Sequence, residues 1–346
     1  MKKIVDVSGY GHSGKTAISE YLKDYEDVFT FPSNVEFELF RVQGGLLDLY
    51  LSIYCSWNLI RSRVRIIEFK KLTRRIGIVH NKFKTSTLWN ASGHGYNQYF
   101  NSKFIEISDE FIEELITVKQ MSFWPYDSLS DSKLKLFFGK IRAKLSKKLI
   151  LTEIFYTDKN QFLKHTSNYI HKLFNEVGVP NQTHVVLNNT FEPYNPTKCI
   201  EMVENSFSII VDRDPRDMYA SMINSQDVFV PSFEEYKNAD ELKKRMLGFD
   251  NINQFISRYR ILKNNVVDDN NNPSVLRIRY EDFILKHDEV ANKIHRHIGL
   301  DNLAKNKNKV FNVNDSMKNV GIWKKYRDLP EIIQIEKELA EYCYQN

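Results

Sequence analysis

The stretch that decides the fold is Ile4-Val5-Asp6-Val7, followed by Gly9-Tyr10-Gly11-His12-Ser13-Gly14-Lys15-Thr16. The second part has the spacing of a phosphate-binding loop: a glycine, four further residues, and then Gly-Lys-Thr. The apolar run before it predicts a buried strand over 4–7, and the residues after it predict a helix over about 15–24. Between a strand and a helix, the loop would hold an anionic group with its backbone N–H groups, and Lys15 would neutralise charge on that group.

Beyond this loop, short apolar runs alternate with helical patterns. Buried strands are predicted over 184–187, 208–211 and 275–279, with a helix near 197–203 between the first two. This order is typical of a parallel sheet covered by helices on both faces. The predicted fold class is therefore α/β: a three-layer P-loop-containing nucleotide-binding fold with a central parallel sheet. A further extended segment is expected from Val28 to about Phe40, broken at Pro32-Ser33-Asn34, and a long amphipathic helix over about 157–177.

We expect one domain over residues 1–346, with a mainly helical insertion at about 41–180. The insertion is basic in two places, which are Arg61, Arg63, Arg65, Lys70, Lys71, Arg74 and Arg75, and then Lys140, Arg142, Lys144, Lys147 and Lys148. These clusters could bind an acidic saccharide or the phosphates of a lipid-linked glycan. They could equally be solvated helix faces.

Composition limits the class of protein and of partner. Hydrophobic residues make up 42% and charged residues 27% of the chain, which excludes a disordered or collagen-like protein. The net charge of +5 favours an anionic ligand but is too small to indicate a nucleic acid. The three cysteines, Cys55, Cys199 and Cys343, have no zinc or disulfide spacing and are expected to be reduced, buried thiols.

No signal for export or membrane insertion is found in the sequence. The N-terminus lacks the apolar run of a signal peptide. The stretch over 45–60 is too short to span a membrane and contains Asp48, so a buried helix is expected there. We therefore expect a cytoplasmic protein without a transmembrane segment, and peripheral membrane contact stays open.

The phosphate-binding loop alone does not identify the reaction. One interpretation is a P-loop kinase that uses Mg-ATP on a small metabolite or sugar. In support of it, the strand Ile209-Ile210-Val211 ends in Asp212, a position suited to a magnesium ligand.

Three further blocks favour another chemistry. The first block follows the predicted strand and reads Arg213-Asp214-Pro215-Arg216-Asp217, with Ser221 after three further residues. The second block is Arg277-Ile278-Arg279-Tyr280-Glu281-Asp282-Phe283. The third lies near the C-terminus and reads Lys318-Asn319-Val320-Gly321-Ile322-Trp323-Lys324. With the loop, these blocks resemble, in order and spacing, the family of sulfotransferases that use 3′-phosphoadenosine-5′-phosphosulfate (PAPS). They cover the first forty residues and about the last 165, whereas about 41–180 does not align.

The resemblance implies a role for each matching residue. The loop from His12 through Ser13, Gly14, Lys15 and Thr16 to Ala17 would wrap the 5′-phosphosulfate of PAPS. Arg213 and Ser221 would hold the 3′-phosphate, since the planar fork of an arginine meets a phosphate with two N–H groups. Tyr280 would lie near the adenine, and Lys318 and Asn319 would belong to the segment that closes over the 3′-phosphate. The other interpretation of the second block is an ion pair between Arg213 and Asp217 on a helix, with Ser221 at the surface.

The loop departs from the family pattern at one point. Many members place Lys or Arg before the Ser-Gly pair and Thr or Ser after it, whereas here His12 precedes the pair and Lys15-Thr16 follow it. Lys15 and His12 are therefore the expected groups on the leaving side. Sulfuryl transfer needs no magnesium, so we assign no metal.

A general base must take the proton of the attacking hydroxyl. Family members that act on glycosaminoglycans carry a Glu about twenty residues past the loop, which implies Glu36 here, with Glu38 as the second candidate. Alternation would put both on one face of an extended segment, where they could also be solvated carboxylates. Members that act on small phenols use a His instead, for which His94 and His184 are the candidates, although His184 opens an apolar strand and fits a core position.

The resulting hypothesis is a carbohydrate-type, bacterial sulfotransferase. It would move a sulfuryl group from PAPS to an acceptor hydroxyl, on a saccharide or glycan, and release 3′-phosphoadenosine-5′-phosphate (PAP). The insertion would shape the acceptor site, and the bacterial assignment depends on the missing membrane anchor. The alternatives are the Mg-ATP kinase and a non-catalytic relative that binds a nucleotide or glycan. The acceptor and the oligomeric state are not predicted.

Overall fold

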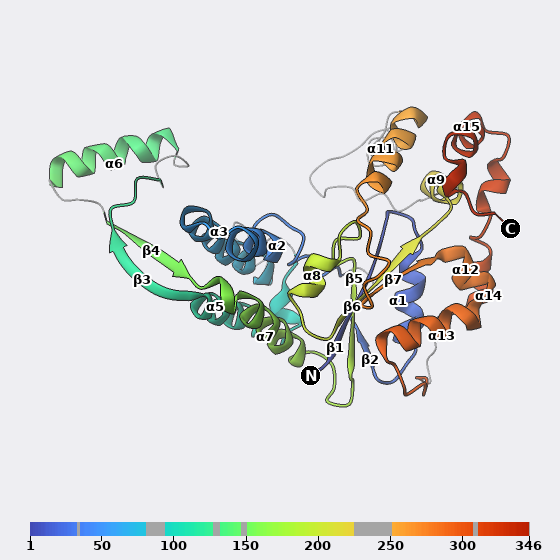
Figure 1. Cartoon of the computed structure of the whole chain (residues 1–346), viewed down its shortest axis with the longest axis horizontal. Helices are drawn as coiled ribbons and strands as arrows, with labels where there is room; N and C mark the ends of the chain where they lie inside the picture. Colours follow the sequence, from blue (N-terminus) through green and yellow to red (C-terminus); the bar gives the residue numbers. More distant parts are fainter. Residues whose placement is uncertain are drawn as a thin grey trace. The chain divides into compact units, whose positions relative to one another are not determined.

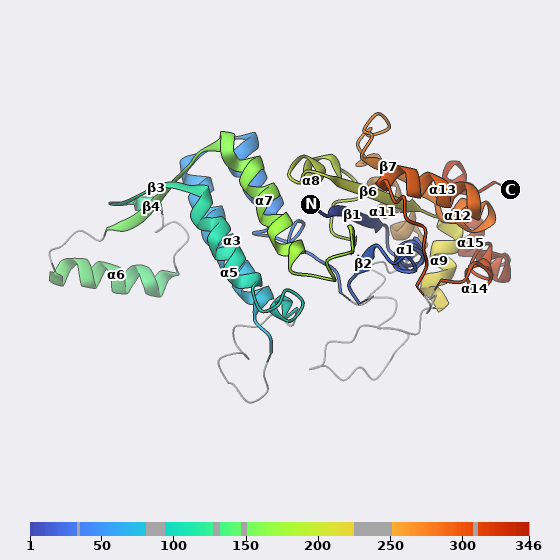
Figure 2. The ribbon, with the colours of Figure 1, turned by 90° about the horizontal axis from the view of Figure 1, so that it is seen from below.

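A computed structural model of the chain describes residues 1–32, 35–80, 94–126, 132–146, 151–224, 251–306 and 311–345. The chain forms two compact units (Figures 1 and 2). The first, here called the sheet unit, contains residues 1–37, 178–200 and 205–346. The second, the insertion unit, contains residues 38–177 and 201–204.

The sheet unit is built on five parallel strands in the order β2-β5-β1-β6-β7. Their bounds are β1 Lys3–Gly9, β2 Val28–Thr30, β5 His184–Asn188, β6 Ser206–Asp212 and β7 Val275–Arg279. The strands predicted over 4–7, 184–187, 208–211 and 275–279 are therefore confirmed. In β1, β5 and β6 the reason is a short run that is apolar and buried along most of its length, whereas β7 is an edge strand and mostly half-buried.

Helices flank this sheet, which confirms the predicted α/β fold class (Figure 1). One apolar core joins the sheet to α1 (Lys15–Lys23), α12 (Tyr280–Leu285) and α13 (His287–Ile298). A second core joins α9 (Pro215–Asn224), α11 (Ile252–Asn264) and α15 (Pro330–Glu338). Shorter helices are α8 (Thr197–Glu201), α14 (Val313–Met317) and 3-10 turns over Ile322–Tyr326 and Ala340–Tyr342.

The carboxyl ends of the strands are held together by a buried aspartate. Asp6 in β1 is fully buried, and its carboxylate accepts hydrogen bonds from the backbone N–H groups of Thr190 and Phe191, at 2.8 and 3.1 Å, and from the hydroxyl of Ser208 at 3.2 Å. Burial raises the pKa of Asp6 to about 6. This carboxylate therefore fixes the loop after β5 against β1 and β6.

The insertion unit contains helices and one antiparallel hairpin. Its elements are α2 Leu46–Leu49, a π-helical turn over Tyr50–Cys55, α3 Leu59–Gly77, α5 Phe104–Leu115, β3 Ile116–Ser122, α6 Lys133–Ser146, β4 Thr152–Thr157 and α7 Phe162–Asn175. Strands β3 and β4 pair with each other and were not predicted. Nearly every side chain of β3 is exposed, so its sequence lacks the alternation that marks a half-buried strand.

Several local expectations were only partly right. In the segment 28–40 the strand covers Val28–Thr30, the expected break at Pro32-Ser33-Asn34 lies partly outside the described residues, and after it the chain turns at Glu38, whose carbonyl accepts from Arg41 N–H at 3.1 Å. The helix expected over 157–177 is confirmed over Phe162–Asn175, after β4. Of the three cysteines, which are all free thiols, Cys55 is exposed and only Cys199 is fully buried.

The stretch expected to be a buried helix, 45–60, is α2 with the π-helical turn, and its apolar side chains Leu46, Leu49 and Ile53 are buried. Within the described ranges, no helix is both long and apolar enough to cross a bilayer. Part of the first basic cluster is paired inside the insertion unit. Arg65 contacts Asp48 and Glu68, Lys70 and Arg74 contact Asp109, and Arg63 is buried with its Nε donating to the Glu153 carbonyl.

Candidate functional site

The topology of the sheet gives one place for a ligand. From β1 the chain crosses to β2 on one side, and β6 and β7 lie on the other side of β1. Open α/β sheets bind ligands at such a switch point, outside the carboxyl ends of the strands. The loop after β1, residues 10–14, and the loop after β6, at Arg213, border this switch point.

The loop after β1 is closely packed. Gly14 precedes α1 with a left-handed φ of +85°, and a Cβ there would overlap the ring of Tyr280. A Cβ on Gly9 would lie 2.6 Å from the carbonyl oxygen of Val211 in β6. Glycine is therefore required at both positions, because the loop is pressed against β6 on one side and α12 on the other.

The loop's polar groups face different surroundings. His12 is exposed and has a φ of +63°; partial removal from water, with the positive charges of Arg213 and Lys15 nearby, lowers its pKa. Ser13 is buried, and its hydroxyl has no hydrogen-bond partner among the described residues. Thr16 is exposed, and Ala17 is half-buried at the first turn of α1. An anion bound at the N-terminus of α1 would therefore contact a neutral His12 and the first backbone N–H groups of the helix.

Arg213 connects the separate blocks of the sequence. Its side chain is 5% exposed, and its two terminal nitrogens donate to the carbonyl of His12 at 3.0 Å and to the carbonyl of Asn319 at 2.6 Å. The guanidinium lies 4.9 Å from the centre of the Tyr280 ring. Its Nε has no hydrogen-bond partner in the described part of the chain. Arg213 is thus a buried cation whose Nε donor is unused within the described residues, between the loop and the C-terminal segment.

Three carboxylates that were not assigned a role hold this arrangement. Glu281, 1% exposed, accepts from the N–H of Asp214 at 2.8 Å, and burial raises its pKa to about 7. Asp217 accepts from the N–H groups of Gly321 and Trp323, at 2.7 and 3.0 Å, and burial raises its pKa. Asp214 forms an ion pair with Arg216 at 2.7 Å. Within the described residues Arg213 and Asp217 form no ion pair, so the interpretation of this block as an ion pair on a helix is wrong.

The other predicted cofactor residues lie nearby with differing exposure. Tyr280 is buried, and its hydroxyl donates to the Ser316 carbonyl at 3.0 Å. Lys318 is exposed just after α14, and Asn319 is half-buried. Ser221 is half-buried on α9, two turns after Arg213. The Tyr280 ring therefore packs against Gly14 and the Arg213 guanidinium, while Lys318 is open to solvent.

Glu36 lies beside the phosphate-binding loop. Its Oε1 is 3.9 Å from the Nζ of Lys15, and both of its oxygens accept from the side-chain amide of Asn189, at 3.3 and 3.2 Å. Asn189 has a left-handed φ of +54° in the loop that Asp6 anchors. The Glu36 carboxylate is thus oriented by the loop after β5 and lies next to Lys15, the only lysine of the phosphate-binding loop.

The remaining base candidates lie elsewhere. His184 is at the amino end of β5, opposite Lys3, and its ring nitrogens bond to Thr183 and to the Ile298 carbonyl, at 2.8 and 3.0 Å. Burial lowers its pKa. It is therefore a core histidine at the opposite edge of the sheet from the loop.

Glu38 and His94 form a pair in the insertion unit. The His94 Nε2 is 3.1 Å from the Glu38 carboxylate. Both line a cavity of about 430 Å³ that also contains Glu68, Lys71 and Arg75. This cavity is rich in hydrogen-bonding and charged groups of both signs.

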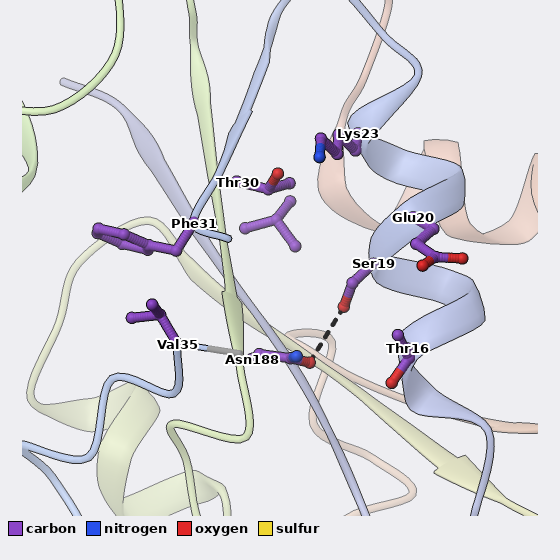
Figure 3. A pocket seen from close by; sticks show the side chains of 9 residues that line it. Thr16, Ser19, Glu20, Lys23, Thr30, Phe31, Val35 and Asn188 are labelled. Atoms are coloured by element: carbon purple, nitrogen blue, oxygen red, sulfur yellow. Dashed lines mark hydrogen bonds between the residues drawn. The ribbon is translucent and has the colours of Figure 1, made fainter. Parts of the chain in front are cut away.

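A second cavity, of about 200 Å³, lies beside α1 in the sheet unit (Figure 3). Thr16, Ser19, Glu20 and Lys23 of α1 line one side, and Phe31 and Val35 lie across from them, with Asn188 below (Figure 3). The Ser19 hydroxyl donates to the Asn188 side chain at 3.2 Å. The cavity opens next to the phosphate-binding loop because Thr16 belongs to both.

Asp212, the residue that suggested a kinase, has a different partner. Its carboxylate is 2.5 Å from the Nζ of Lys263, which lies over the rings of Tyr10 and Tyr259. Burial lowers the pKa of Lys263. Asp212 is therefore engaged by a cation of the same chain, which competes with a metal ion for it.

Comparison with known proteins gives few matches. No family model matches the sequence, and no curated protein matches it. Among solved structures, the chain is similar to the "Sulfotransferase Domain from the Curacin Biosynthetic Pathway", with 13% identity over 98% of this chain and 97% of that one and a TM-score of 0.36. It is also similar to retinol dehydratase "in complex with androsterone and inactive cofactor PAP", with 13% identity over 98% and 80% of the two chains and a TM-score of 0.32. At these values the interpretation of the site depends on this chain's own residues.

Proposed function

We propose that this protein is a PAPS-dependent sulfotransferase. The observation that carries the proposal is the position of Arg213: a buried guanidinium joins the loop after β1, at His12, to the C-terminal segment, at Asn319, and has a donor left over. A nucleotide with phosphates at both its 5′ and 3′ positions needs two anion sites a ribose apart. The phosphate-binding loop would supply one, and Arg213 with Ser221 would supply the other, under the segment that contains Lys318 and Asn319.

The reaction follows from the residues around Lys15. The acceptor hydroxyl oxygen attacks the sulfur, the bond from sulfur to the bridging oxygen breaks, and PAP leaves with that oxygen. Glu36 takes the acceptor proton, and its hydrogen bonds from Asn189 keep the carboxylate in place. Lys15 and the N–H groups at the start of α1 stabilise the charge that develops on the leaving phosphate. His12, whose pKa is lowered, serves on the same side as a neutral donor.

The acceptor in this proposal is a saccharide, with the insertion unit shaping its site. The cavity lined by Glu38, Lys71, Arg75 and His94 supports this assignment, because it offers both hydrogen-bond acceptors and cations to hydroxyls and acidic groups of a sugar. Glu38 is the second candidate for the base.

Calorimetric titration tests the nucleotide site. We expect the full chain to bind PAP without added metal and to bind Mg-ATP more weakly. Arg213→Ala should weaken PAP binding at least tenfold, since a charge-assisted hydrogen bond contributes roughly 1.5–3 kcal/mol. The control is Arg296→Ala, which removes an exposed arginine on α13 and should leave PAP binding unchanged.

Each class of alternative has its own outcome. Preference for Mg-ATP, with PAP affinity unchanged in Arg213→Ala, would refute the proposal in favour of a kinase. PAP binding without sulfuryl transfer to any of a panel of saccharides, phenols and alcohols would point to a non-catalytic nucleotide-binding protein.

A further inference from the structure

The helix α6 exposes an unusual number of apolar side chains. It lies in the chain between strands β3 and β4 of the insertion unit. Leu134 is 70% exposed, Phe137 58%, Phe138 64% and Leu145 80%, and Ile141 is exposed as well. No side chain described on this helix is fully buried. Single exposed apolar residues are ordinary, but five on one helix of 14 residues mark an interaction surface.

These five residues form one stripe. Leu134, Phe138, Ile141 and Leu145 are three or four residues apart, and Phe137, next to Phe138 in the chain, is three residues after Leu134, so all five follow one face of the helix. At roughly 100° per residue, they fall within an arc of roughly 100°. Gly139 and Ser146 lie on the opposite side by the same spacing. The helix therefore directs five large apolar side chains to solvent, while its opposite side carries the half-buried Leu136, Gly139 and Ala143.

The charges on α6 are of one sign only. Between Lys133 and Ser146 the sequence has five lysines and arginines and no acidic residue. By helical spacing, Lys140 and Lys144 flank the apolar stripe on one edge, and Arg142 flanks it on the other. All three side chains are exposed. Long basic side chains in this position can place their charges at a polar boundary while their stems lie along an apolar phase.

We propose that α6 binds the surface of an anionic phospholipid membrane, with the stripe in the acyl boundary and the flanking cations at the headgroups. Charge complementarity selects this occupant, since an apolar stripe bordered by cations matches a layer that is apolar inside and negative at its surface. A second copy of α6 would bring five like charges against five. A nucleic acid would leave the apolar stripe in water. The inference depends on α6 alone and stands apart from the proposed sulfuryl transfer.

Vesicle co-sedimentation of the full chain tests this inference. The probes are vesicles of phosphatidylcholine alone and of phosphatidylcholine mixed with phosphatidylglycerol. We expect binding to the anionic vesicles that weakens as salt is raised, because the cations act through a screened potential. Little binding is expected on the neutral vesicles.

A pair of charge-matched variants separates insertion of the stripe from simple charge attraction. Phe138→Glu with Leu145→Glu puts two negative charges on the apolar face, whereas Gly139→Glu with Ser146→Glu puts them on the opposite face. A Cβ at Gly139 would meet no atom within 4 Å, and all four side chains lie at or near the surface, so both variants should keep the melting temperature of the parent. The first should bind anionic vesicles at least tenfold more weakly than the second.

Three results would overturn the inference. Equal binding by the two variants would mean that the stripe does not insert. Equal binding to neutral and anionic vesicles would show that the flanking cations do not contribute to membrane binding. Binding to calcium-loaded calmodulin, used as an acidic groove probe, without binding to vesicles would show that α6 recognises a protein groove instead.

Discussion

The buried carboxyl of Glu281, which binds the backbone of Asp214 in the loop after β6, allows a quantitative test of stability against pH. Glu281→Gln keeps an oxygen that can accept from the Asp214 N–H and replaces the other carboxyl oxygen, which is buried with no hydrogen-bond partner among the described residues, by an amide nitrogen. The substitution therefore changes the charge of the side chain and little of its shape.

The size of the effect follows from the pKa. Burial raises the pKa of Glu281 from 4.5 to about 7. At roughly 1.4 kcal/mol for each tenfold change in proton affinity, ionising Glu281 in the folded protein costs about 3 kcal/mol more than ionising it in the unfolded chain. Between pH 4.5 and 7 the folded state binds more protons than the unfolded state, so the parent protein loses stability as pH rises through this window.

Urea unfolding at a series of pH values measures this loss. We expect the stability of Glu281→Gln minus that of the parent to increase by about 3 kcal/mol from pH 4.5 to pH 7 and to level off above it. Glu289→Gln removes an exposed carboxylate on α13 and serves as the control, with a small difference from the parent. A difference between Glu281→Gln and the parent that stays constant from pH 4.5 to 8 would refute the reasoning.

Two further substitutions test the loop and the base. Glu36→Gln should leave PAP affinity within about twofold of the parent but lower the turnover of an accepted hydroxyl substrate by roughly 10²–10⁴-fold, the usual contribution of a general base. Glu38→Gln should lower this turnover much less. A larger loss of turnover in Glu38→Gln than in Glu36→Gln would make Glu38 the base. Gly14→Ala should destabilise the protein by about 1–3 kcal/mol, because the residue has a left-handed φ and its Cβ would overlap Tyr280, whereas Gly11→Ala should be near neutral because a Cβ there meets nothing within 4 Å. Thermal unfolding compares the two, and equal melting temperatures would contradict the tight packing of the loop.

The fold could be predicted from the sequence where the signal was local. The glycine loop and the runs that became β5 and β6 each contain their own evidence, since a strand buried on both faces is apolar along most of its length. The edge strand β7 is mostly half-buried and contains two arginines, so its local signal was weaker. The hairpin of β3 and β4 could not be found this way, because β3 is mostly exposed and β4 is mostly half-buried, so neither strand forms a continuous apolar run. Beyond the expected break at Pro32-Ser33-Asn34, the alternation of Val35, Phe37 and Leu39 with Glu36 and Glu38 predicted a second extended run, but the backbone turns at Glu38.

The site was predictable only as far as single residues in a motif. The blocks around Arg213 and Tyr280 were recognised, but not that Glu281 binds the Asp214 backbone or that Asp217 binds Gly321 and Trp323. These partners are 67, 104 and 106 residues apart, and no local pattern states such pairs. Likewise, spacing placed Glu36 past the loop, but its approach to Lys15 depends on the course of the chain between them.

The central position of β1 has a consequence for synthesis on the ribosome. Lys3 lies opposite His184, so the first strand to be made must wait for about 181 residues before its neighbour exists. At roughly 5–20 residues per second, that delay is about 10–40 s. The insertion unit, which is nearly continuous in the chain, can fold during this time. Nascent chains arrested at a length where the insertion unit has left the ribosome but β5 has not should therefore resist protease in the insertion unit and be cut within the first 37 residues. Protection of both segments would show that the N-terminal strand finds a temporary partner before β5 emerges.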